Sequence, residues 1–154
     1  MSRRTGRQDS PSDERAVLAL LALLAVPWSV QRYADGGTTL LFAWGLLNTA
    51  PVRATTLTDF LFVYTRGLPE YIFSWPLSVA FYVCAAVSAV VGWRGGPEDP
   101  RVTGGLLVLA GVAQLSLAWG FSVQPGRTAW PVGTLALWTV AWWAYWPRAK
   151  RRRK

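Results

Sequence analysis

The chain has 154 residues but no histidine and a single cysteine, Cys84. Histidine is the usual general base near neutral pH and the commonest metal ligand, so its absence argues against both kinds of site. A single cysteine excludes a disulfide within the chain and a structural zinc site. The sequence contains no glycine-rich phosphate loop and no metal-ligand spacing. We therefore expect no catalytic residue, no cofactor-binding residue, no metal ligand and no enzyme activity.

Charged side chains are missing from several long apolar stretches, although the whole chain carries a net charge of +8. Hydrophobic residues make up 52% of the sequence, which is more apolar surface than a soluble domain of this size can bury. A helix needs about 20 apolar residues to cross a bilayer, a length that two stretches exceed and two approach. The sequence predicts four transmembrane helices, at about 16–31, 72–93, 102–123 and 130–146.

The first and last of these stretches are the shortest. We expect Trp28, Arg32 and Tyr33 to complete the first crossing at the membrane interface. Because a basic leader precedes this stretch, a cleaved signal peptide is the alternative interpretation, but no small-residue cleavage site follows before Trp28. We expect Pro147 to end the last helix.

Basic residues predict how the chain is oriented. The leader, the loop after Trp93 and the C-terminal tail hold twelve of the sixteen lysines and arginines, and the remaining loops hold four. The positive-inside rule then predicts a multi-pass protein of the cell membrane with both termini in the cytoplasm. We divide the chain into a disordered cytoplasmic tail (1–15), a membrane domain (16–147) and a basic cytoplasmic tail (148–154).

The outer excursion, 32–71, connects the first two predicted spans. Alternating residues in 38–47 predict a strand, and a re-entrant or interfacial helix is the alternative. The hydroxyl residues Thr55 and Thr56 then predict the start of a short amphipathic helix that ends near Gly67. The expected fold class is an all-α membrane protein, a four-transmembrane-helix bundle with this structured extracytoplasmic excursion between helices 1 and 2.

Three sequence segments resemble a known family. Trp44-Gly45-Leu46, the run from Asp59 to Pro69 and the segment Trp75-Pro76-Leu77-Ser78 resemble an uncharacterised family of small four-span membrane proteins from halophilic archaea. This resemblance covers nearly the whole chain and implies an archaeal membrane protein without an assigned activity. The expected topology is also loosely similar to that of claudin and tetraspanin-like proteins, but the two loop cysteines of claudins are absent, so a disulfide-clamped sheet is not implied.

The outer excursion holds the candidate interaction residues, because it combines apolar side chains with most of the outer charges. Neither Asp59 nor Glu70 has a nucleophile or metal ligand beside it in the sequence, so we do not expect catalytic carboxylates. The interaction set is Phe42, Trp44, Leu46, Arg53, Asp59, Phe60, Tyr64, Arg66 and Glu70. The residues expected to bind anionic lipid head groups are Arg148, Lys150, Arg151, Arg152, Arg153 and Lys154.

The predicted function is that of a non-enzymatic integral membrane protein. We expect an accessory or scaffold subunit, or a self-associating envelope component, whose outer excursion docks onto another membrane protein or a second copy. A passive pore or carrier for small solutes is the first alternative. A membrane enzyme is a third class, which would require a polar cavity that holds Asp59, Arg66 and Glu70 together. The expected partners are membrane lipids and protein, and not nucleic acid. Gln114 is expected to join helices by a hydrogen bond, and a tryptophan stripe at 138, 142 and 146 is expected to face lipid, neighbouring helices or a pigment.

Overall fold

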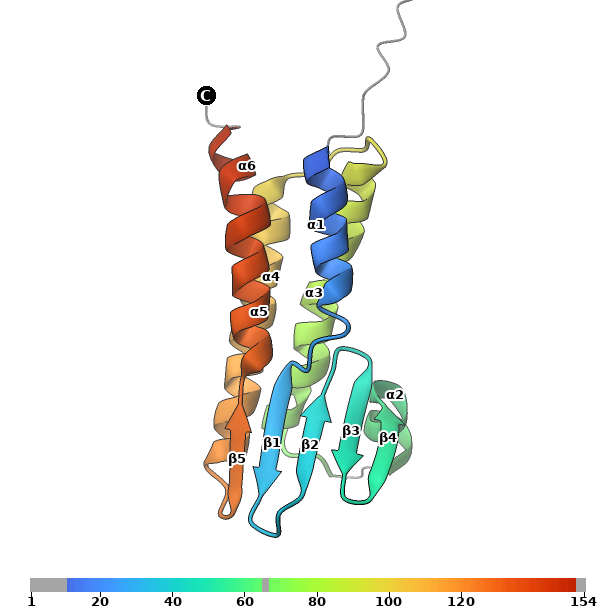
Figure 1. The fold of residues 1–154 in the computed structure, drawn as a ribbon, viewed down its shortest axis with the longest axis vertical. Coiled ribbons are helices and arrows are strands. Elements are labelled where there is room, and N and C mark those ends of the chain that lie inside the picture. The colour runs from blue at the N-terminus through green and yellow to red at the C-terminus, as the bar shows by residue number, and fades with distance from the viewer. Residues whose placement is uncertain (1–10, 65–66, 152–154) are drawn as a thin grey trace, which may run out of the picture.

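The computed structural model describes residues 11–64 and 67–151. Long helices stand side by side, a single sheet covers the ends of α3 and α4 at one end of the molecule, and both described ends of the chain lie at the other end (Figure 1). The helical part consists of α1 (Pro11–Ala22), α3 (Ser74–Trp93), α4 (Pro100–Ser122), α5 (Val132–Val140), the π-helix η3 (Ala141–Tyr145) and α6 (Trp146–Arg151). Three short elements precede α3, namely α2 (Leu57–Asp59), the π-helix η1 (Phe60–Tyr64) and the 3-10 helix η2 (Glu70–Phe73).

The sheet is antiparallel and has five strands in the order β4-β3-β2-β1-β5. The first four strands follow one another in the chain, whereas β5 is contributed by the connection between α4 and α5 and pairs with β1. The strands are β1 (Ser29–Tyr33), β2 (Thr38–Leu41), β3 (Gly45–Thr49), β4 (Val52–Thr56) and β5 (Arg127–Trp130).

The expected all-α bundle of four transmembrane helices is wrong, because the protein has a mixed α/β fold. Among the described residues, two helices are long and apolar enough to cross a membrane, Glu70–Trp93 and Pro100–Ser122. The predicted span at 16–31 fails because α1 ends at Ala22 and Ser29 already belongs to β1. Pro27 has no backbone N–H to continue a helix, and the N–H of Trp28 instead donates to the carbonyl of Leu41 at 2.6 Å.

The outer excursion also differs from its prediction. The single strand expected at 38–47 is a hairpin of β2 and β3, paired Leu41 to Leu46. The helix start is confirmed, since the Thr56 hydroxyl accepts a hydrogen bond from the Asp59 N–H at 3.1 Å. The helical run at the C-terminal end begins after β5 and passes through Pro147 instead of ending there.

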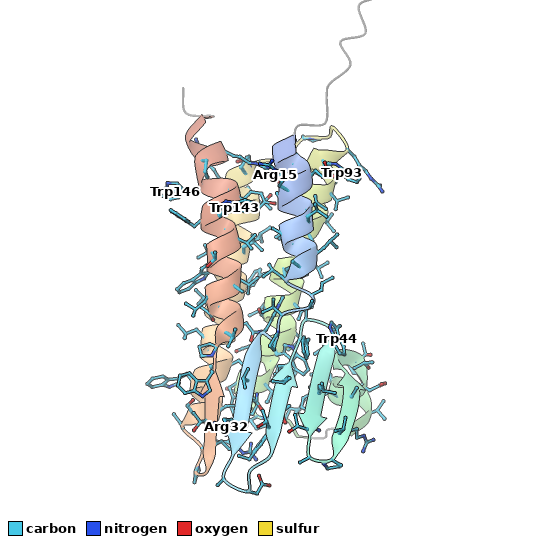
Figure 2. All side chains as sticks on the ribbon, in the orientation of Figure 1. Arg15, Arg32, Trp44, Trp93, Trp143 and Trp146 are labelled. Carbon is cyan, nitrogen blue, oxygen red and sulfur yellow. The ribbon has the colours of Figure 1, made fainter. Side chains whose placement is uncertain are left out.

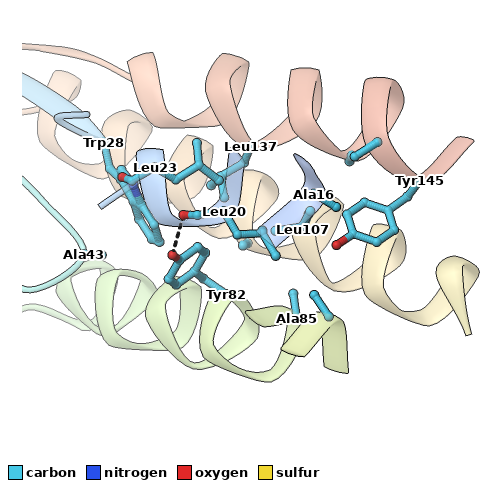
Figure 3. Close-up of a cluster of buried hydrophobic side chains, with 14 residues drawn as sticks. Ala16, Leu20, Leu23, Trp28, Ala43, Tyr82, Ala85, Leu107, Leu137 and Tyr145 are labelled. Atoms are coloured by element: carbon cyan, nitrogen blue, oxygen red, sulfur yellow. Dashed lines mark hydrogen bonds between the residues drawn. The ribbon is translucent and has the colours of Figure 1, made fainter. Parts of the chain in front are cut away.

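Tryptophan side chains attach the sheet to the helices. The indole N–H of Trp28 donates to the carbonyl of Leu23 at 2.9 Å, and that of Trp75 donates to the carbonyl of Phe42 at 3.0 Å. Trp28 is fully buried in a cluster that also contains Tyr82, whose hydroxyl donates to the Leu20 carbonyl at 2.6 Å (Figure 3). A sheet therefore forms without any disulfide, held to the bundle by indole donors and apolar packing.

Candidate functional site: a cavity between the sheet and the helices

A row of polar side chains crosses the inner face of the sheet. Gln31 of β1 pairs with Thr39 of β2, which pairs with Asn48 of β3, which pairs with Arg53 of β4. Directly paired residues lie on the same face of an antiparallel sheet, so these four residues form one continuous row, here called the polar row. Its members all line a cavity on the side of the sheet that faces the helices.

This cavity, here called the sheet cavity, has a volume of about 660 Å³ and lies between the polar row and the ends of α3 and α4 that are nearest the sheet. Its opposite wall is apolar and includes Trp75, Leu117 and Phe121, which belong to one buried cluster. Small-molecule sites in proteins typically have volumes of about 300–1,000 Å³ and combine apolar walls with a few polar groups. The sheet cavity therefore has the size and the two-sided character of a ligand site.

Most of the polar row is hydrogen-bonded within the protein, with one exception. The Thr39 hydroxyl donates to the side-chain oxygen of Asn48 at 2.6 Å, and the Tyr33 hydroxyl donates to Oε1 of Gln31 at 3.1 Å. The Nε2 group of Gln31 has no hydrogen-bond partner among the described residues, although the residue is only 3% exposed. Leaving a buried donor unpaired costs about 1–3 kcal/mol of stability. This amide is therefore the polar group of the cavity that gains most from a hydrogen-bond acceptor.

The charged residues that line the sheet cavity are basic. Arg53 and Arg127 belong to the two edge strands of the sheet, and both are exposed at the rim. The Arg127 guanidinium lies 5.5 Å from the centre of the Tyr33 ring, its partner across the β1–β5 ladder. Within the described part of the chain, no aspartate or glutamate lines the cavity. Its charge therefore favours an anionic occupant.

A second cavity, of about 550 Å³, lies between α4 and the helical run 132–151. It is lined on one side by Gly104 and Gly105 and on the other by the predicted tryptophan stripe. Trp138 is fixed within the bundle, because its indole N–H donates to the Val108 carbonyl at 3.1 Å. The cavity is mostly apolar, so it offers few polar groups that would select a specific ligand.

The structure separates the predicted interaction residues into groups. Leu46, Arg53 and Phe60 line the sheet cavity. Phe42 and Trp44 stack on each other with ring centres 5.0 Å apart, and the Trp44 indole donates to the Leu24 carbonyl next to α1. Asp59 and Glu70 are exposed outside the cavity lining, the Tyr64 side chain is not described, and Arg66 lies outside the described residues.

One of the predicted lipid-binding residues has partners within the protein. Arg148 forms an ion pair with Asp13 at 3.1 Å, and its guanidinium also lies 5.5 Å from the centre of the Tyr145 ring. These contacts join α6 to α1 at the end of the molecule away from the sheet. The side chains of Lys150 and Arg151 are not described, and residues 152–154 lie outside the described part of the chain.

Sequence reasoning missed the centre of the sheet cavity. Gln31 was expected to end the first membrane span, and Thr39 and Arg127 were assigned no role. A signal for β1 was present, because Ser29, Gln31 and Tyr33 alternate with other residues, as in a strand with one polar face. The apolar run before them concealed this alternation.

Comparison with curated proteins gives no match for this chain. One family model does match, and the match extends from residue 1 to residue 154, so it includes the helices, the sheet and the residues of the sheet cavity. The chain therefore belongs to the family described as domain of unknown function (DUF8050).

Proposed function

We propose that the protein is a multi-pass integral membrane protein with both termini in the cytoplasm. We further propose that the five-stranded sheet and the short elements α2, η1 and η2, here called the lobe, form an extracytoplasmic, non-enzymatic recognition module. In this arrangement α3 and α4 cross the bilayer, and α1 and the run 132–151 pack beside them. The resemblance to small membrane proteins of halophilic archaea agrees with this placement.

The apolar outer surface of the helices is the observation that carries the proposal. In the most apolar 18-residue stretches of Glu70–Trp93 and Pro100–Ser122, only 28% and 44% of the residues are buried. A core helix of a soluble protein is mostly buried, whereas a lipid-facing helix presents apolar side chains outward. The exposed apolar residues along these two helices include Leu77, Val83, Val87, Val91, Val108, Leu109, Val112, Leu115 and Trp119.

The charged residues lie at the two ends of the helices. Arg15 lies at the end away from the sheet, and Arg32 lies in the lobe (Figure 2). Both termini of the described chain, and the turn between α3 and α4, also lie at the end of the molecule away from the sheet (Figure 1). Because twelve of the sixteen basic residues belong to this end in sequence, the positive-inside rule supports a cytoplasmic location for it.

Single-cysteine labelling tests this orientation, because Cys84 is the chain's only cysteine and lies exposed on α3. In a Cys84→Ser background, a membrane-impermeant maleimide should label Val52→Cys in intact cells and Arg94→Cys only after lysis. Cys84 itself should react with this reagent only after detergent denaturation, because it faces lipid. Labelling of Arg94→Cys in intact cells would overturn the orientation, and labelling of Cys84 in membranes would overturn the spanning role of α3.

An exposed apolar patch supports a docking role for the lobe. Phe62, Val63 and Phe73 are 82%, 66% and 55% exposed. Phe62 and Phe73 line a shallow depression together with Pro76. Large exposed apolar patches usually mark contacts with other proteins or with membranes. We propose that this patch, together with its neighbour Leu61, contacts another membrane protein or a second copy.

Light scattering in mild detergent and co-purification from membranes test this docking role. Phe62→Ser should reduce the mass of the complex, whereas Val52→Ser, at an exposed residue of β4 that does not line the depression, should leave it unchanged. A monomer of the native chain in every detergent and lipid condition, with no co-purifying protein, would contradict the docking role.

A further inference from the structure

The two walls of the sheet cavity have opposite character, and this contrast identifies a class of ligand. The sheet contributes amide, hydroxyl and guanidinium groups, whereas α3 and α4 contribute aromatic and aliphatic side chains. We infer that the sheet cavity binds a small amphipathic carboxylate, with its carboxylate against the polar row and its apolar body against the helices. This inference does not depend on the membrane orientation, because the cavity is formed by the packing of the sheet on α3 and α4, whichever side of the membrane the sheet faces.

The unpaired amide of Gln31 indicates which atom the ligand must present. Oε1 of Gln31 already accepts from the Tyr33 hydroxyl, so the group that remains is the Nε2 donor. Gln31 lines the cavity and is only 3% exposed, so a further acceptor for this donor, a water or a ligand, has to lie inside the cavity. A carboxylate oxygen fits this need, because hydrogen bonds to charged acceptors are stronger than those to neutral ones.

The charge at the rim indicates that the acceptor is an anion carrying a single charge. The Arg127 guanidinium stands at one edge of the cavity over the Tyr33 ring, and Arg53 stands at the other edge. The groups between them are neutral, which suits one negative charge better than the two charges of a phosphate monoester. Because Arg127 is exposed, its guanidinium attracts an anion from solution and contacts the carboxylate at the mouth of the cavity, and Arg53 adds to the positive charge at the opposite edge.

The helical wall indicates the rest of the ligand. The indole N–H of Trp75 is already bonded to the Phe42 carbonyl, so the cavity receives only the apolar surface of this ring. Phe121 and Ile72 extend this surface, and both are buried in the same cluster. A phenyl or short alkyl group is therefore expected on this side of the ligand.

Binding of 3-phenylpropionate to the full chain in lipid nanodiscs tests the inference. Saturation-transfer NMR should show contact with the phenyl protons, and the ligand should raise the midpoint of thermal unfolding. The matched probes 3-phenylpropanol and 3-phenylpropylammonium have the same apolar body without the negative charge, and neither should bind detectably at the same concentration. Equal binding of the alcohol would overturn the carboxylate assignment, and absence of binding of 3-phenylpropionate at millimolar concentration would overturn the inference.

Two substitutions locate the binding. Gln31→Met removes the amide and keeps the length of the side chain, so it should weaken binding by about tenfold or more while the protein remains folded. Arg127→Gln should weaken binding by about tenfold through loss of the guanidinium. The matched control is Arg32→Gln, because Arg32 is an exposed arginine next to Gln31 on β1, where successive side chains point to opposite faces. An equal loss in Arg32→Gln would show that surface charge, and not the cavity, attracts the probe.

The ligand-binding test and the test of membrane orientation can fail separately. Probe binding is measured on protein that is accessible from both faces of the nanodisc, whereas orientation is measured by maleimide labelling in cells. Normal labelling without probe binding would overturn the ligand inference alone, and probe binding with reversed labelling would overturn the orientation alone.

Discussion

At the scale of single residues, the structure changes the interpretation of the tryptophans. Trp28 was expected at the membrane interface, but it is fully buried and donates its indole N–H to the Leu23 carbonyl. Trp44 and Trp75 also donate to backbone carbonyls near the junction of helices and sheet. Indole groups combine a large apolar surface with one donor, so they can satisfy exposed carbonyls while they fill the core. These three tryptophans therefore have a structural role at the junction.

Replacement of Trp75 by phenylalanine tests this role. Trp75→Phe keeps an aromatic ring but leaves the Phe42 carbonyl without its donor, which should destabilise the protein by about 1–3 kcal/mol. The midpoint of thermal unfolding, measured by circular dichroism in detergent, should fall by several degrees. Trp119→Phe is the control, because Trp119 is 75% exposed on α4 and should tolerate the change. Equal midpoints for the two variants would contradict the anchoring role of Trp75.

A second residue-scale prediction concerns the contact between the last helical run and Trp28, the residue just before β1. A Cβ atom added at Gly133 would lie 2.6 Å from Cα of Trp28. This overlap is with a backbone atom, so it can be relieved only if the backbone moves. Gly133→Ala should therefore destabilise the protein by about 1–3 kcal/mol. Gly105→Ala in α4 meets no atom within 4 Å and should be neutral or slightly stabilising, since alanine favours helices. Thermal unfolding of both variants under the same conditions gives the comparison, and a stable Gly133→Ala protein would refute the close contact.

At the scale of elements, the helical run at the C-terminal end shows how the chain accommodates a proline. Pro147 cannot donate to a carbonyl in the preceding turn, and its ring clashes with that turn in a regular α-helix. The π-helix η3 (Ala141–Tyr145) directly precedes the segment that contains Pro147, and wider turns of this kind relieve such a clash. The helix therefore continues past the residue that was expected to end it.

The turn between β1 and β2 gives the element-scale prediction. Gly36 has a φ of 89°, where a side chain is strained, although a Cβ atom there would meet no atom within 4 Å. Gly36→Val should therefore cost about 1–2 kcal/mol through the backbone alone. Gly36→Asn should cost less, because asparagine adopts positive φ more readily than other residues with a side chain. Chemical denaturation of the two variants measures the difference, and equal stability would show that the turn does not constrain this residue.

The sequence predicted elements well where the signal was local. α3 and α4 lie close to their predicted ranges, because the predicted stretches 72–93 and 102–123 are long runs of apolar residues without charge. The sheet was not predicted, because β1 follows an apolar run and pairs with β5, almost a hundred residues later. The same reason explains why the candidate site was predicted only in part: Leu46, Arg53 and Phe60 were singled out, but Gln31 was not. Long-range pairing decides which side chains share a cavity, and no local pattern contains that information.

At the scale of the whole molecule, polar and apolar surfaces are divided along the long axis. The lobe concentrates polar groups around the sheet cavity, whereas the helices expose apolar side chains along their length (Figure 2). The interhelical hydrogen bond expected for Gln114 is not formed, because both polar atoms of its buried amide have no partner among the described residues. The hydrogen bonds of α4 with α3 and α5 instead include those of Ser78 and Thr134, which donate to the backbone carbonyls of Ala110 and Gly111.

This division predicts opposite responses to the same substitution at two exposed valines. Val87 is 57% exposed in the middle of α3, and Val52 is 81% exposed on β4. If α3 crosses the bilayer, Val87→Lys places a charge among lipid tails, which costs about 2.5–3.5 kcal/mol in insertion assays. Val52→Lys should be nearly neutral, because lysine on an edge strand remains in water.

Carbonate extraction of membranes from expressing cells measures the outcome. The Val87→Lys chain should appear in the membrane pellet in strongly reduced amount, and Val52→Lys should match the native chain. Val87→Ser controls for the loss of the apolar side chain without a charge and should give an intermediate or native yield. Both valines are on the surface of the protein, so their lysine variants should differ only if one valine faces lipid and the other faces water. Equal yields of the two lysine variants would therefore mean that the exposed face of α3 is in contact with water.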